Sequence, residues 1–268
     1  MPIARVNGVE LHYEQRGAGV PVVFSHGLLW SGRMFDAQLA ALAGSHLCIR
    51  YDHRGQGQSP RSPSPYDMDD LSVDAAALIE SLGAAPCHFV GLSMGGMVGL
   101  RLALRRPELL RSLTLIESAA DREPRRNIPK YRAMALLARL IGLGVLVPPV
   151  MKIMFGRAFL RDPARASERA TEEAHLRALD VPGMIAALDC VIRRRPLTGE
   201  LGRIATPTLV LHGEDDRAIT PRRAQATAEA ISGARLVKLP RAGHTSSVEE
   251  PEAVSAELAR FFASLDRA

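Results

Sequence analysis

The sequence predicts an α/β fold in which a mostly parallel eight-stranded sheet is flanked by helices. Segments with strand pattern alternate with segments of helical pattern along most of the chain, which is typical of this class. The length of 268 residues is ample for one large core. One stretch departs from the alternation, because residues 121–202 carry helical pattern and no strand-like run. We therefore expect a core formed by residues 1–120 and 203–268, interrupted by a helical insertion at 121–202.

Eight short runs rich in apolar and β-branched residues predict the strands. They are expected at Ile3–Val6, Val9–Glu14, Val22–Ser25, Leu47–Tyr51, Cys87–Val90, Ser112–Glu117, Thr208–His212 and Arg235–Leu239. Asn7-Gly8 joins the first two as a hairpin with a type I′ turn. Helical spacing predicts one helix over Met97–Arg105 and another that begins near Pro251.

The insertion is helical from about Pro129 to Arg195. Within it, Ala133–Val147 is apolar except for Arg139, and Pro148-Pro149 is expected to end that run. These 15 residues, with one internal charge, are too few to cross a bilayer. A helix that is apolar on most sides is usually buried. We expect it to pack against the core; a subunit interface and the wall of a ligand pocket are the alternatives.

The net charge of +5 raises the possibility of a nucleic-acid partner, but the distribution argues against one. Lys occurs only at positions 130, 152 and 238, and Arg residues are interspersed with acids. No basic helix or aromatic stacking platform is present. Small clusters at Arg125-Arg126 and Arg193–Arg195 would suit an anionic substrate or a membrane face.

Cysteine usage and motifs indicate neither a disulfide framework nor a metal site. Cys48, Cys87 and Cys190 form an odd set, and no C-x-x-C or H-E-x-x-H spacing occurs. The Gly55-Gln-Gly57 turn lacks the ending of a phosphate loop. We therefore expect no metal and no cofactor. The first residues lack a charged and then apolar leader, so the expected location is the cytoplasm.

Ser93 lies in a G-x-S-x-G frame between a predicted strand and a predicted helix. Small residues at Gly91 and Gly95 allow a sharp bend that lifts the hydroxyl clear of the sheet. A Gly-rich helix start with an N-capping serine is the structural alternative. In the context of strand, turn and helix, the frame predicts a nucleophilic serine.

A serine nucleophile requires a base, and the positions of the eight histidines favour His244. It stands on a loop late in the chain, after a predicted strand. His12, His46 and His88 lie in or beside apolar runs and are expected to be structural, whereas His175 in a polar helix is expected to be solvated.

The acid that orients the base is expected on the loop after Thr208–His212. Glu214, Asp215 and Asp216 are consecutive there, so charge alone does not choose among them. The order nucleophile, acid, histidine is retained by all three. Glu117, at the end of the Ser112–Glu117 strand, is a further candidate.

Five motifs in order resemble those of α/β-hydrolases, in the branch of esterases and 3-oxoadipate enol-lactonases. They are Phe24-Ser-His-Gly27, Tyr51-Asp-His-Arg-Gly-Gln-Gly57 with Ser59, Gly91-Leu-Ser-Met-Gly95, Leu211-His-Gly-Glu-Asp-Asp216 and Gly243-His244. The resemblance spans nearly the whole chain. It implies that Asp216, three residues after Gly213, is the triad acid, with Asp215 as second choice. It also implies that 121–202 is a cap over the site.

The oxyanion formed when Ser93 attacks a carbonyl needs fixed donors. Met94, the residue after the nucleophile, offers one backbone N–H. The resemblance of His26-Gly27-Leu28-Leu29 to the family's His-Gly turn implies that Leu28 offers the second, with His26 structural.

The predicted function is a cofactor-independent serine hydrolase for a carboxylic ester or lactone. Leu29, Trp30, Met34 and Ile219 lie near the predicted catalytic loops, which indicates a small-molecule substrate with an apolar portion. Arg217 is expected to pair with Asp215 or to face a carboxylate of the substrate. Carbon–carbon bond hydrolases and perhydrolases use the same triad and stay open, and a non-catalytic ligand-binding protein on this fold is the competing class. The length indicates nothing about oligomeric state.

Overall fold

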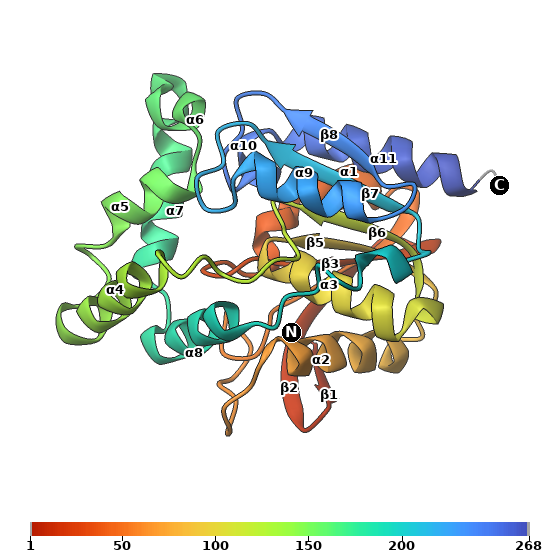
Figure 1. Cartoon of the computed structure of the whole chain (residues 1–268), viewed down its shortest axis with the longest axis horizontal. Helices are drawn as coiled ribbons and strands as arrows, with labels where there is room; N and C mark the ends of the chain where they lie inside the picture. The colour runs from red at the N-terminus through yellow and green to blue at the C-terminus, as the bar shows by residue number, and fades with distance from the viewer. Residues whose placement is uncertain (1, 267–268) are drawn as a thin grey trace.

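The computed structural model describes residues 2–266, which contain an eight-stranded sheet of order β1-β2-β4-β3-β5-β6-β7-β8 (Figure 1). The strands are β1 (Ile3–Val6), β2 (Val9–Arg16), β3 (Val20–Ser25), β4 (His46–Tyr51), β5 (Cys87–Leu92), β6 (Leu110–Ile116), β7 (Thr208–Gly213) and β8 (Arg235–Leu239). All eight predicted strands are present, and the ends of six differ from prediction by one to two residues.

The strand pairings confirm a mostly parallel sheet. β1 and β2 form an antiparallel hairpin in which Val6 is paired with Val9. The two turn residues, Asn7 and Gly8, have φ of 47° and 73°, as the predicted type I′ turn requires. β2 pairs antiparallel with β4, and every later pairing is parallel. The carboxyl ends of β3 to β8 therefore meet at one edge of the sheet.

Helices cover both faces of the sheet (Figure 1). Along β3, Val23 packs on the side of α2 and α3, whereas Val22 and Phe24 pack on the side of α1 and α11. This alternation is the two-residue period of a strand buried on both faces. The helices of the core are α1 (Asp36–Leu42), α2 (Met68–Ser81), α3 (Met94–Arg105), α9 (Pro221–Ala230), α10 (Ser246–Glu249) and α11 (Pro251–Asp266), with short 3₁₀ helices η1 (Gly32–Phe35), η2 (Pro107–Leu109) and η4 (Leu201–Arg203).

Two glycines allow β5 to turn directly into α3. A Cβ atom on Gly91 would lie 2.3 Å from the carbonyl oxygen of Gly95, and one on Gly95 would lie 1.9 Å from that of Ser25. Both distances are far below van der Waals contact, and both contacts are with backbone, which cannot rotate away. The steric reason for the glycines in the G-x-S-x-G frame is thus confirmed.

We expect Gly95→Ala to destabilise the fold by more than about 2 kcal/mol, because the added methyl group collides with the backbone of β3. Thermal unfolding measured by calorimetry should show a midpoint lower by about 5 °C or more. Gly202→Ala is the matched control, since no atom lies within 4 Å of its added Cβ. Equal midpoints for the two variants would contradict this account of the turn.

Between β6 and β7 the described chain is helical, as predicted. The helices are α4 (Ile128–Ile141), α5 (Val147–Met154), α6 (Arg157–Arg161), α7 (Ala166–Arg177) and α8 (Val181–Arg193), with the 3₁₀ helix η3 (Pro163–Arg165). The prediction of a single run over 133–147 is wrong. Gly142, with φ of 82°, ends α4, and Pro148-Pro149 lies in the first turn of α5. Proline is tolerated there because the N–H groups of a first turn have no helical acceptor.

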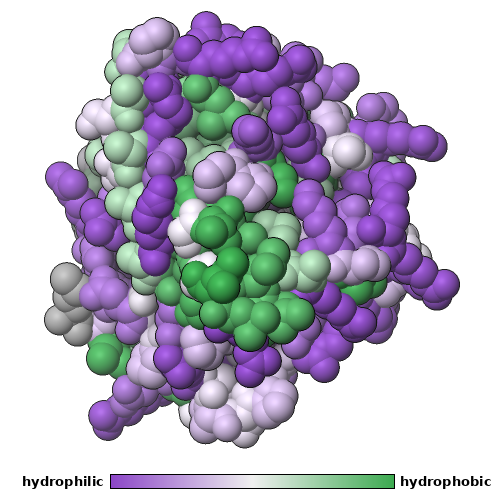
Figure 2. Space-filling view, turned by 90° about the vertical axis from the view of Figure 1, so that its left-hand side faces the viewer, coloured by the Kyte–Doolittle hydropathy of each residue, from purple (hydrophilic) through white to green (hydrophobic). Residues whose placement is uncertain are grey.

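The expectation that this apolar run is buried is wrong for much of α4. Leu136, Leu137, Leu140 and Ile141 are between 42% and 70% exposed, and Val145 in the following loop is 56% exposed. Figure 2 shows apolar side chains gathered on the face of the molecule that carries α4 to α7. The opposite side of α4 packs inward, where Ala138 is buried.

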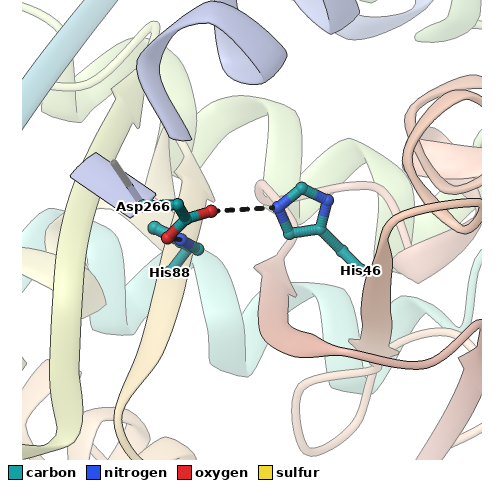
Figure 3. A group of neighbouring side chains, drawn as sticks. All are labelled: His46, His88 and Asp266. Atoms are coloured by element: carbon teal, nitrogen blue, oxygen red, sulfur yellow. Dashed lines mark ion pairs between the residues drawn. The ribbon is translucent and has the colours of Figure 1, made fainter. Parts of the chain in front are cut away.

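At the amino ends of the strands, His46 and His88 approach the carboxylate of Asp266 near the end of α11 (Figure 3). His46 Nε2 lies 3.8 Å from Asp266 Oδ2, and His88 Nε2 lies 3.6 Å from Oδ1. His88 also bonds Ser112 through Nδ1 and stacks on Phe262. As predicted, both histidines are structural, and they join the last helix to the sheet.

The burial of His88 in this cluster predicts that the free energy of unfolding falls as the pH is lowered. Burial lowers the pKa of His88 from the usual 6.5 to about 4, although Asp266 opposes the effect. Below pH 6.5 the unfolded chain therefore binds a proton that the folded chain binds only near pH 4, so stability falls across this window. Unfolding midpoints measured from pH 7.5 to 4.5 should fall less steeply for His88→Gln than for the parent. Parallel curves would contradict the assignment.

Candidate active site

The three predicted catalytic side chains lie on loops at the carboxyl edge of the sheet. Ser93 follows β5, Asp216 lies beyond β7, and His244 lies beyond β8. These strands are parallel and, with β6 between β5 and β7, lie in the order β5-β6-β7-β8. The topology therefore brings Ser93 to the same edge as Asp216 and His244, which both lie more than 100 positions later in the chain.

Ser93 occupies a strained turn at the start of α3. Its φ of 50° and ψ of −109° lie outside the regions that non-glycine residues favour. Hydrogen bonds hold the turn: Ser93 N donates to the carbonyl of Ile116 at 2.8 Å, and Ser118 Oγ donates to the Ser93 carbonyl at 2.8 Å. The residue is only 9% exposed, and it lines a cavity.

Asp216 and His244 form a buried hydrogen-bonded pair. His244 Nδ1 lies 2.8 Å from Asp216 Oδ2, and Oδ1 of the same carboxylate accepts from the backbone N–H of Ala218 and Ile219. Burial would raise the pKa of Asp216, but His244, His212 and the Ile219 amide together lower it, so the carboxylate stays ionised. An ionised acceptor at Nδ1 holds the proton there and leaves Nε2 free to accept one.

Glu249 organises the loop that carries His244, and sequence reasoning missed it. Its carboxylate accepts from the backbone N–H groups of Gly243, Thr245 and Gly156 at 2.7–3.1 Å, and also from the Thr245 hydroxyl. Burial raises its pKa, which these donors oppose. A carboxylate five residues after the base is an available signal, but only the fold shows that it also binds Gly156, at the start of α6.

The structure separates the competing acids. Glu117 has φ of 47° and is fully buried, but both of its oxygens accept from Gly213 N, and Oε2 lies 3.1 Å from His212 Nδ1. Burial and the nearby Asp216 raise the pKa of Glu117 well above its usual value. Burial and the Asp216 charge thus both favour the protonated form of Glu117, whereas Asp216 is held ionised.

Asp215 points to a different partner. Its carboxylate pairs with Arg157 at 2.9 Å, at the start of α6. The expected pair between Arg217 and Asp215 is wrong, since Arg217 donates to the Lys152 carbonyl instead. Of the four candidate acids, Glu214, Asp215, Asp216 and Glu117, only Asp216 hydrogen-bonds His244 within residues 2–266.

Of the two predicted oxyanion donors, Leu28 lines the same cavity as Ser93, and Met94 directly follows Ser93. Within residues 2–266, no hydrogen bond takes up the backbone N–H of Leu28 or of Met94. Met94 is the first residue of α3, where an N–H has no acceptor inside the helix. His26 donates through Nδ1 to the Gly27 carbonyl and accepts at Nε2 from His53 N, so it is structural in this turn, as expected.

A cavity of about 140 Å³ opens beside Ser93 and His244. Leu28, Leu29 and Met97 line it from the core, and most of the remaining wall comes from the helices between β6 and β7. Glu123, Tyr131, Ser93 and His244 are the lining residues with polar side chains. The Glu123 carboxylate is paired with the buried Arg194, so the cavity presents little free charge.

The four predicted substrate-binding residues divide into two pairs. Leu29 and Ile219 line the cavity. Trp30 and Met34 do not, because the chain turns after Leu29 into η1 and places both in the core cluster. The expectation of a solvated His175 is also wrong: its Nε2 donates to the Leu29 carbonyl at 2.9 Å, beside the ring of Trp30.

Within residues 2–266, two groups of histidine and carboxylate side chains are compact enough to hold a cation. In His46–His88–Asp266, Arg111 already donates to the carboxylate at 2.8 Å. In Glu117–His212–Asp216, the carboxylates already accept from His244 and from backbone amides. The chemistry of both groups is thus that of internal hydrogen bonding.

A model of the alpha/beta hydrolase family matches residues 22–257. The chain belongs to this family. A relative from Pseudomonas savastanoi named "Putative carbamate hydrolase RutD" is 33% identical over 248 residues, which cover 90% of this chain and 93% of the relative. The enol-lactonase from Burkholderia xenovorans superposes with a TM-score of 0.90 at 31% identity, over 98% and 100% of the two chains. A thermophilic esterase from Thermogutta terrifontis superposes at 0.91 and 26% identity, over 98% of each.

Membership in the alpha/beta hydrolase family confirms the predicted fold class and family. The matched residues include Ser93, Asp216 and His244 and also the helices α4 to α8. The two solved hydrolases superpose on nearly the whole chain. They therefore share with it both the core and the helical segment between β6 and β7.

Proposed function

We propose that this chain is a cofactor-independent serine hydrolase that cleaves a carboxylic ester or lactone through Ser93, His244 and Asp216. The observation that carries the proposal is the buried hydrogen bond between His244 Nδ1 and Asp216 Oδ2, beside the cavity that Ser93 and His244 both line. A hydroxyl on a strained turn, an imidazole and an ionised carboxylate are the parts that nucleophilic acyl transfer requires.

The reaction proceeds in two halves. Ser93 Oγ attacks the carbonyl carbon while its proton passes to His244 Nε2, and the carbonyl oxygen becomes an oxyanion bound by the N–H groups of Leu28 and Met94. The bond to the leaving alkoxide breaks as His244 returns the proton to it, which leaves an acyl group on Ser93. Water then attacks this acyl group by the same route, and Ser93 is regenerated. The ionised Asp216 stabilises the imidazolium in both halves.

The walls of the cavity support a substrate with an apolar portion. Leu, Val, Ile and Met side chains from α5, α8 and the adjoining loops dominate the lining, so burial of hydrocarbon drives binding there. We propose that residues 121–202 act as a cap that supplies this wall, with the core at 1–120 and 203–268. The similar enol-lactonase and esterase both act on carboxylic esters in the broad sense, which supports the same class for this chain.

The test is a fluorophosphonate probe followed by a substrate panel. We expect rapid labelling that is absent in Ser93→Ala, and turnover that is greater for esters or an enol-lactone than for a vinylogous diketone. Labelling without turnover of any ester, lactone or carbamate would favour the binding-protein alternative. Preferred cleavage of the diketone would assign the chain to carbon–carbon bond hydrolysis.

A further inference from the structure

The positive charge of the chain is concentrated in one segment. Residues 124–161, which include α4, α5 and α6, hold eight of the 34 basic residues and none of the 29 acidic ones. The rest of the chain is therefore slightly acidic, with 26 basic and 29 acidic residues. Basic and acidic residues are interspersed elsewhere in the chain but not in this segment. A positive electrostatic field of this kind is typical of a surface that binds an anionic partner.

The same segment carries a stripe of exposed apolar side chains on α4. Ala133, Leu136, Leu137 and Leu140 follow one another at helical spacing, and Val145 extends the stripe past Gly142. Figure 2 shows this apolar area surrounded by hydrophilic side chains. Grouped aliphatic side chains this exposed mark a contact surface.

Five cations on and before α4 are available to a partner. They are Arg125, Arg126, Lys130, Arg132 and Arg139, all exposed, and none is in an ion pair within the part of the chain that the structure describes. Arg157, further along the segment, shows the contrast, because it is bound to Asp215. Leaving five cations unpaired beside an apolar stripe favours a partner that supplies anions together with hydrocarbon.

We propose that α4 docks on the surface of an anionic lipid bilayer, with the Leu136–Leu140 stripe among the acyl chains and the five cations at the headgroups. An amphipathic helix with leucines on one side and basic residues beside them lies in the plane of the interface. The helix lies on the membrane without crossing it, in keeping with the lack of any helix within 2–266 that is long and apolar enough to span a bilayer.

A second copy of the chain fits this surface less well. In a two-fold dimer the stripe of one copy faces the stripe of the other, which brings each set of five cations against the same five. The segment contains no acidic residue to pair with them. Like charges facing each other oppose association, whereas phosphate headgroups attract every one of these cations.

The test is co-sedimentation with vesicles of phosphatidylcholine containing about one-third phosphatidylglycerol, compared with phosphatidylcholine alone. We expect at least about tenfold tighter binding to the anionic vesicles, weakened by added salt because salt screens the attraction. The double variant Leu136→Ser/Leu140→Ser should bind both kinds at least about tenfold more weakly. The triple variant Lys130→Gln/Arg132→Gln/Arg139→Gln should lose the preference for anionic vesicles.

Matched controls carry the same chemical changes elsewhere. Val73→Ser alters an apolar residue that is 48% exposed on α2, and Arg16→Gln/Arg222→Gln/Lys238→Gln removes three exposed cations from the core. Both control variants should bind the anionic vesicles as tightly as the parent does and with the same preference over phosphatidylcholine alone. Unchanged unfolding midpoints show that the variants are folded. The proposal is overturned if the parent does not bind anionic vesicles, or if the controls lose as much binding as the α4 variants. It is also overturned if Leu136→Ser/Leu140→Ser abolishes a dimer but leaves vesicle binding unchanged.

Discussion

Replacement of Ser93 by alanine is expected to reduce kcat for a p-nitrophenyl ester by about 10⁴-fold or more, because the acyl group then has no hydroxyl to receive it. The loss should fall on kcat rather than on KM, since the walls of the cavity are unaltered. Residual hydrolysis would come from water in a site whose oxyanion donors are still in place.

The fold should tolerate this change. The strained turn is held by the backbone N–H and carbonyl of Ser93, which alanine retains. The unfolding midpoint should therefore be close to that of the parent. Ser81→Ala, at the end of α2, is the matched control and should keep full activity. Activity of Ser93→Ala above about a tenth of the parent's would exclude Ser93 as the nucleophile.

Asp216→Asn is expected to lower kcat by about 10³- to 10⁴-fold while leaving the fold intact. The amide of asparagine is neutral and can present an N–H to His244 Nδ1. It would then stabilise the tautomer with its proton on Nε2, which cannot accept the proton of Ser93. Loss of the negative charge also removes the stabilisation of the imidazolium. The measurement is a kcat and KM determination with an ester, at several pH values.

Glu117→Gln is the variant that separates the two buried carboxyl groups. Because burial and Asp216 raise the pKa of Glu117 and so favour its neutral form, glutamine replaces the side chain with a neutral group of the same shape. Activity should stay within about tenfold of the parent. If Glu117→Gln were the inactive variant and Asp216→Asn the active one, the triad acid would be Glu117.

Local features of the sequence were sufficient to place Ser93 at a strand-to-helix turn and to predict the strands. Gly91 and Gly95 are required by steric contacts within and next to the same turn, so their spacing around Ser93 predicts the bend directly. The hairpin at Asn7-Gly8 is equally local, because only residues that accept positive φ fit its turn. Strand ends were less exact, since pairing with neighbours decides where a strand stops.

Contacts between side chains of distant segments could not be predicted from local sequence features. Trp30 directly follows the predicted oxyanion loop in the sequence, yet its indole donates to Glu172 on α7, 142 positions away. Glu249 binds a backbone N–H 93 positions away. The apolar run of α4 met the pattern of a buried helix, but no neighbouring element covers Leu136 or Leu140.

What the sequence alone determined was the fold class, the place of Ser93 at a strand-to-helix turn, and a histidine and a group of acids on the loops that follow. Those properties come from sterics and periodicity over a few neighbouring residues. Only the tertiary structure showed which of Asp215, Asp216 and Glu117 hydrogen-bonds His244, which sides of α4 face the cavity and the outside, and which backbone groups Glu249 binds. The reason is physical: the partner of a buried imidazole or carboxylate depends on the register of strands and the packing of loops that lie far apart along the chain.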